Sequence, residues 1–170
     1  LLLNDPSRRR ELIMNVLNDN PGEYVELLKQ ARMNEDVEVV HYAITAMVEL
    51  SKEYDYRLQK IEKQYTNDPV VLEEYCDFLK EYLSQGFMEK QMEQIYRNQY
   101  TQLLLKQLEQ KVNLHTCVCL MENLMVQRDF FLAEKVLKIM DQNWHRGEEY
   151  WIWKIRYLAE RKMGKELKQS

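Results

Sequence analysis

Helix start signals recur along this chain at regular intervals, and between them the apolar residues follow helical spacing. Three starts place Pro directly after Asp or Asn, at the first helical position, where the missing N–H leaves no hydrogen bond unmade: Asp5-Pro6, Asn20-Pro21 and Asp68-Pro69. No segment alternates apolar and polar residues between turn signals, as a half-buried strand would. These patterns predict an all-α fold without strands.

The spacing predicts about eight helices joined by short connections. The third is the longest, because apolar residues recur from Val39 to Tyr65 at steps of three and four without a breaker. It forms a spine of about 30 residues, or about 45 Å. Short connections make neighbouring helices antiparallel, so we expect a right-handed α-solenoid of helix pairs. The predicted ranges are 6–18, 21–32, about 35–65, 69–84, 88–110, 114–127, 130–142 and 148–163.

A set of three residues followed by a turn residue occurs twice with the same spacing. Tyr75, Phe78, Tyr82 and Gly86 are separated by three, four and four residues. The same steps separate Cys117, Leu120, Leu124 and Arg128, with Ala133 and Leu137 in the helix that follows, and Trp151 lies 34 residues after Cys117. These spacings resemble the tetratricopeptide repeat (TPR) family. The resemblance implies pairs of antiparallel helices whose first members line a concave groove for a partner protein.

One interval departs from the 34-residue period. Tyr75 and Cys117 are 42 residues apart, which is eight more than the period and about 2.2 helical turns. We interpret the extra residues as a lengthened helix over 88–110. By these patterns residues 67–170 hold TPR-like repeats, at about 69–110, 114–143 and 148–170.

The N-terminal part has a different pattern. The run from Glu35 to Ala43 is similar to the second helix of a HEAT repeat, so residues 1–66 are expected to form HEAT-like helices that end in the spine helix. This order of repeats follows three leucines and Arg8–Arg10, and together they resemble the cytoplasmic domains of the PelE family. Those proteins are membrane-anchored accessory subunits of bacterial Pel exopolysaccharide synthesis.

The PelE resemblance implies a location and partners. The chain would lie at the cytoplasmic face of the inner membrane, attached through an anchor upstream of Leu1. Its partners would be the cyclic-di-GMP receptor PelD and the glycosyltransferase PelF. The alternative is a TPR-type regulator that binds a signalling peptide or a transcription factor.

Charge and cysteine usage limit the function classes. The chain has 24 basic and 28 acidic residues, a formal charge of -4, so we expect no nucleic-acid binding. The three cysteines are an odd number, which indicates free thiols in a reducing compartment. The four glycines are too scattered for a phosphate-binding loop. The expected location of this fragment is therefore the cytoplasm.

No combination of residues predicts catalysis, a cofactor or a metal. His115, Cys117 and Cys119 follow one another at steps of two, which turn about 200° on a helix, so the three cannot converge on one ion. Carboxylates alternate with lysines along solvated helix faces. The sequence favours a non-enzymatic scaffold.

The repeat alignment predicts which residues line the groove. Trp151 and Trp153 lie two residues apart, so they cannot both face one core, and the alignment places Trp151 inside and Trp153 in the groove. A buried Trp153 would contradict this prediction, and a neighbouring helix of a longer protein is the alternative occupant. The predicted groove residues are Asp77, Lys80, Val118, Cys119, Glu122, Met125, Ile152, Trp153 and Arg156.

Overall fold

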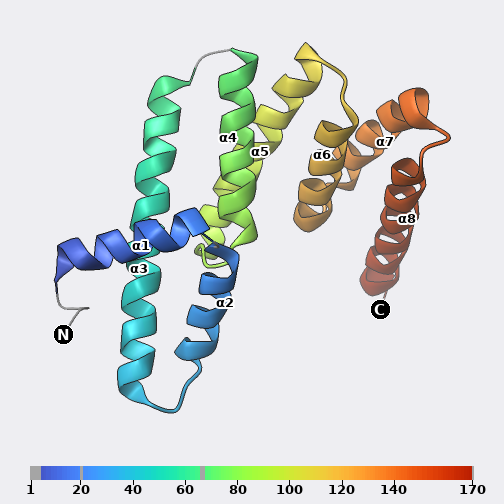
Figure 1. Ribbon diagram of the computed structural model, residues 1–170. Coiled ribbons are helices and arrows are strands. Elements are labelled where there is room, and N and C mark those ends of the chain that lie inside the picture. The colour runs from blue at the N-terminus through green and yellow to red at the C-terminus, as the bar shows by residue number, and fades with distance from the viewer. Residues whose placement is uncertain (1–4, 20, 66–67, 170) are drawn as a thin grey trace. The chain divides into compact units, whose positions relative to one another are not determined.

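The computed structural model describes residues 5–19, 21–65 and 68–169, which form helices joined by short connections (Figure 1). Within these residues there are eight helices and no strand, so the all-α prediction is confirmed. Consecutive helices pack against one another, as in an α-solenoid. The helices are α1 (Pro6–Asp19), α2 (Pro21–Arg32), α3 (Val37–Gln64), α4 (Pro69–Ser84), α5 (Lys90–Gln110), α6 (Leu114–Gln127), α7 (Phe130–Trp144) and α8 (Glu148–Gln169).

Side-chain caps explain most of the helix starts. The carboxylate of Asp68 accepts a hydrogen bond from the Val70 N–H at 2.8 Å, and Asp36 caps α3 in the same way. Asn113 and Asp129 cap α6 and α7. These side chains satisfy amide groups that the helix itself leaves unbonded. Asn20, also predicted as a cap, lies outside the described residues.

Two helix ends share an unusual backbone conformation. Gly86 follows α4 with φ at +69°, and Arg128 ends α6 with φ at +57°. In the repeat alignment Arg128 occupies the place of Gly86, so the two turns correspond in conformation although only one has glycine. A left-handed residue at this place is a common way to end a helix.

The described residues form two compact units. The first consists of residues 5–65 and 77–90, and the second of residues 68–76 and 91–169. The division therefore falls inside α4, whereas the predicted domain boundary lies just before that helix. Each unit has its own buried core.

An aromatic cluster holds the core of the first unit. The ring of Tyr54 on α3 stacks on that of Tyr82 on α4 with centroids 4.7 Å apart, and both rings also meet Phe87. The Tyr54 hydroxyl donates to Glu81 at 3.0 Å, while the Tyr82 hydroxyl donates to Asp55 at 2.8 Å. Burial, and next the Glu81 carboxylate, raise the pKa of Tyr54. The two hydroxyl groups therefore fix the register of α3 against α4.

The second unit is built around α6. The predicted core positions Cys117, Leu120 and Leu124 are completely buried, and Ala133 and Leu137 of α7 are buried too, as the repeat spacing predicts. The core of α6 and α7 therefore follows the spacing of three and four residues between buried positions.

A buried amide ties α6 to α5. The Asn123 side chain donates to the Arg97 carbonyl at 3.0 Å and to the Thr101 hydroxyl at 2.8 Å, and its oxygen accepts from the Arg97 guanidinium at 2.9 Å. Gln127 extends the network by accepting from Thr101 at 3.2 Å. The sequence patterns did not predict this network. The sequence feature that could have indicated it is a pair of polar residues four positions apart on each helix. These are Arg97 and Thr101 on α5, and Asn123 and Gln127 on α6.

Candidate interaction surface

The two sides of α8 have opposite roles. Tyr150, Trp153 and Tyr157 are buried, with Trp153 only 6% exposed. On the other side of the helix, Trp151 is 45% and Ile155 64% exposed. This reverses the prediction for the two tryptophans, because the repeat alignment placed Trp151 inside and Trp153 in the groove.

A shift of one residue accounts for the reversal. Tyr150, Trp153 and Tyr157 are separated by three and four residues, the spacing that the two preceding units also show. The buried residues of the third predicted repeat therefore begin at Tyr150, one residue before the predicted position. Trp151 lies at the turn instead, where its indole N–H donates to the His145 carbonyl at 2.9 Å. The run of three aromatic residues at core spacing was the signal that could have identified this start.

Burial removes three residues from the predicted groove. Trp153, Cys119 and Met125 are all buried, so they do not offer the exposed surface that a groove needs. Cys119 packs beside Tyr100 of α5, and burial, followed by the effect of Cys119, raises the pKa of that tyrosine.

The other predicted groove residues are accessible to different degrees. Glu122, Ile152 and Arg156 are exposed and Val118 is half-buried, all in the second unit. Arg156 lies over the Trp153 ring, 4.9 Å from its centroid. Asp77 is exposed and Lys80 half-buried, and both belong to the first unit.

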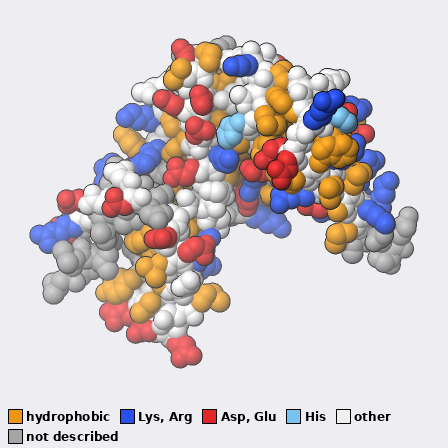
Figure 2. Space-filling view, turned by 45° about the vertical axis from the view of Figure 1, so that its right-hand side comes forward, with side chains coloured by type: hydrophobic (Ala, Val, Ile, Leu, Met, Phe, Trp, Pro, Cys, Tyr) orange, Lys and Arg blue, Asp and Glu red, His pale blue; other side chains and the backbone are white. Residues whose placement is uncertain are grey.

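The corrected start at Tyr150 defines a different surface. The same offsets that gave the predicted groove positions now give Glu148, Trp151, Ile152 and Ile155, all of which are exposed. Figure 2 shows hydrophobic side chains gathered over the C-terminal helices, with Lys and Arg beside them. We define the α8 outer face by its exposed apolar residues Trp151, Ile152, Ile155, Leu158 and Met163.

Cations border the α8 outer face. The Lys154 ammonium lies 5.7 Å from the centre of the Tyr150 ring, and the Arg161 guanidinium donates to the Tyr157 hydroxyl at 2.8 Å. These contacts hold two cations beside a cavity of about 190 Å³ between α7 and α8. From Lys154 to the end of the sequence there are six cations and two carboxylates, in a chain with a formal charge of -4. The part of α8 from Lys154 onward is therefore a basic region of an acidic protein.

The candidate metal ligands do not form a site. His115 and Cys119 are one helical turn apart, with Nε2 and Sγ at 3.7 Å. Cys117 is completely buried, and burial raises the pKa of its thiol to about 11. Among the described residues no group of three His, Cys, Asp or Glu side chains is placed to hold a metal ion. All three cysteines are buried thiols, and none of them forms a disulfide.

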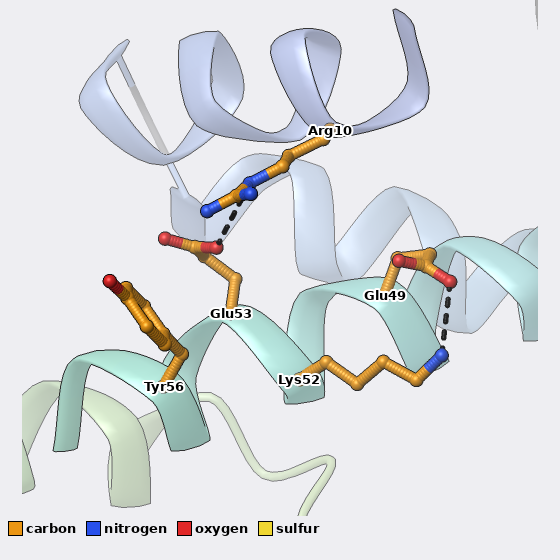
Figure 3. A pocket seen from close by; sticks show the side chains of 5 residues that line it. All are labelled: Arg10, Glu49, Lys52, Glu53 and Tyr56. Carbon is orange, nitrogen blue, oxygen red and sulfur yellow. Dashed lines mark hydrogen bonds and ion pairs between the residues drawn. The ribbon is translucent and has the colours of Figure 1, made fainter. Parts of the chain in front are cut away.

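A pocket of about 390 Å³ lies beside α3 and is lined by charged side chains that pair with one another (Figure 3). The buried Glu53 carboxylate lies 3.3 Å from the Arg57 guanidinium and 4.0 Å from that of Arg10, which reaches over from α1. Lys52 pairs with Glu49 at 3.2 Å. The pocket is therefore an ion-pair contact between α1 and α3.

None of the helices in the described part of the chain is long and apolar enough to cross a membrane. In comparisons with known proteins, the sequence matches no protein-family model, no curated protein and no solved structure. The function of the chain is therefore inferred from its surfaces.

Proposed function

We propose that this chain is a non-catalytic scaffold that binds a partner protein on the α8 outer face. The observation that carries the proposal is the exposure of Trp151, Ile155 and Leu158 along one side of a helix whose other side is core. A helix that only faces solvent is expected to carry polar residues there. Contiguous exposed apolar residues with a polar rim are typical of protein interaction sites.

The chemistry of the α8 outer face specifies the partner. Three of its apolar residues, Trp151, Ile155 and Leu158, lie four and three positions apart, the pattern on which an amphipathic helix or hairpin can lay its own apolar side. Lys154, Arg156 and Lys162 lie beside them, so carboxylates of the partner would be attracted and cations repelled. The partner is therefore acidic and amphipathic. Trp151 supplies the large aromatic anchor that often dominates such contacts.

A binding titration tests the proposal. The probe is a fluorescein-labelled helical peptide with Leu on one face and Glu on the other, followed by fluorescence anisotropy at low salt. A second peptide carries Lys in place of every Glu, and a third has the Leu positions scrambled. We expect the protein to bind the first peptide and to bind the others at least about tenfold more weakly.

Two variants locate the binding. Ile155→Glu places a charge in the middle of the α8 outer face and should abolish binding. Ile95→Glu makes the same change at a residue of α5 that is 56% exposed, and should bind as the unmodified chain does. Equal binding by both variants, or no preference for the acidic peptide, would contradict the proposal.

A narrower hypothesis assigns this scaffold to a Pel exopolysaccharide complex at the bacterial inner membrane, with PelD and PelF as partners. Its support is the sequence resemblance alone. Purified PelD or PelF should bind the unmodified chain and lose binding to Ile155→Glu. If neither binds, the Pel assignment is wrong, while the peptide titration still decides whether the α8 outer face is a docking surface.

A further inference from the structure

The turn between α2 and α3 is a second exposed apolar surface. Met33 and Val37 are 83% and 80% exposed, the two highest values among the large apolar side chains of the described residues. Ile44 and Val48 continue the exposed line along α3, seven and eleven residues after Val37. We call Met33, Val37, Ile44 and Val48, with the intervening acidic turn, the α2–α3 tip.

The α2–α3 tip has a defined conformation. The Asn34 side-chain oxygen accepts from the Asp36 N–H at 2.9 Å, and Asp36 in turn caps α3 through the Glu38 N–H at 2.8 Å. The Met33 N–H donates to the Gln30 carbonyl at 3.0 Å, which closes the end of α2. The exposed apolar side chains are therefore presented by an ordered turn, so little conformational entropy remains to be lost on binding.

The charges of the tip and of α8 are opposite. Residues 23–49 contain six carboxylates and two cations, the reverse of the six cations and two carboxylates from Lys154 onward. One of the two cations, Lys29, already pairs with Glu26 at 3.0 Å. Glu35 and Glu38 lie at the turn itself, next to the exposed apolar residues. The tip thus has the acidic and amphipathic character that the proposed function requires of a partner.

We propose that the partner of the α8 outer face is the α2–α3 tip of a second copy of this chain. This proposal rests on the proposed function, whose docking surface it uses. Each copy carries both surfaces, so the contact is head-to-tail, and one copy can bind one neighbour through its tip and another through its α8. A symmetric antiparallel pairing of α8 with α8 is less favourable, because a two-fold axis would set the flank with Lys154 and Arg161 against itself.

Sedimentation velocity on the full chain over a range of concentrations tests the proposal. At low salt the average mass should rise with concentration, because each copy can bind one neighbour through its tip and another through its α8. High salt should return the protein to the monomer, since it screens the charges that align the two surfaces. A mass that stays at that of the monomer, or association that high salt leaves unchanged, would overturn the proposal.

Complementation of two variants gives the sharper test. The tip variant carries Met33→Glu and Val37→Glu, and the tail variant carries Ile155→Glu and Leu158→Glu. Each alone should remain monomeric, because it lacks one of the two surfaces. Their mixture should form a complex that stops at one copy of each, since the tip variant keeps its α8 and the tail variant keeps its tip.

Control measurements separate a loss of folding from a loss of association. Far-ultraviolet circular dichroism checks that every variant is folded, and Ile95→Glu should associate as the unmodified chain does. Association of the tail variant alone, or a mixture that stays monomeric, would overturn the proposal. If the unmodified chain is monomeric throughout but binds the acidic peptide through α8, self-association is wrong and the proposed function stands. If the unmodified chain neither associates nor binds the acidic peptide, the self-association proposal and the proposed function are both wrong.

Discussion

Helices α6 and α8 belong to the same unit but are surrounded differently. α6 is engaged on several sides, by the Asn123 network with α5 and by packing against α7 and α8. Its described buried residues include polar Thr116 as well as Met121 and Leu124. α8 is buried on one side only, although its other side carries the apolar residues Trp151, Ile155 and Leu158. Apolar residues at helical spacing therefore indicate core in α6 and a free surface in α8.

The first test of this difference between α6 and α8 is to remove a large buried side chain from α8. Trp153→Ala should cost about 3–5 kcal/mol of unfolding free energy, because it leaves a cavity where a large aromatic ring was packed. Urea unfolding followed by circular dichroism measures the change. A loss below about 1 kcal/mol would mean that Trp153 is not part of the core.

The buried amide of α6 should come next in effect. Asn123→Ala removes the hydrogen bonds that this buried amide makes to the Thr101 hydroxyl and to the carbonyl and guanidinium of Arg97, which should cost about 1–3 kcal/mol. Asn143→Ala is the matched control, since that exposed side chain bonds only within its own helix. Equal unfolding midpoints for the two variants would show that the network does not hold α5 to α6.

Alkaline pH should destabilise the surroundings of α6. Burial raises the pKa of Cys117 from 9.0 to about 11, so the folded chain keeps this proton at a pH where the unfolded chain loses it. Stability therefore falls as the pH rises from about 9 to about 11, by on the order of 2 kcal/mol from this thiol. Cys117→Ala should lose less stability over the same range in urea unfolding. An equal loss in the variant would contradict the assignment.

The exposed side of α8 should contribute least to stability. Trp151→Ala removes an exposed ring and one hydrogen bond to the His145 carbonyl, so the unfolding free energy should change by about 1 kcal/mol or less. The same change should weaken peptide binding at least about tenfold. A variant that loses stability without losing binding would place Trp151 in the core.

The helices were predictable because their signals are local. The caps at Asp36, Asp68 and Asn113 and the steps of three and four between apolar residues depend on neighbours within one or two turns. α8 is the exception in length: its predicted end lies just before Gly164, but the helix continues to Gln169. A single glycine costs a helix about 1 kcal/mol and does not necessarily end it.

The candidate site was predicted only in part, because burial depends on contacts between helices. Ile152 and Arg156 are exposed as expected, but Trp153 is buried. The third predicted repeat begins one residue earlier than the alignment placed it, and one residue turns a helix by about 100°. The Asn123 network was missed for a related reason. A polar residue on an apolar face is recognisable as a network only when its partners on the next helix are known.

Fluorine NMR on the chain labelled with 5-fluorotryptophan tests the α8 outer face most directly. Trp144, Trp151 and Trp153 give separate probes, assigned by replacing each with Phe in turn. On titration with the acidic amphipathic peptide, the Trp151 resonance should shift while that of the buried Trp153 stays in place. A shift confined to Trp153 or Trp144, or no shift at a peptide concentration that saturates the anisotropy signal, would show that partners bind elsewhere.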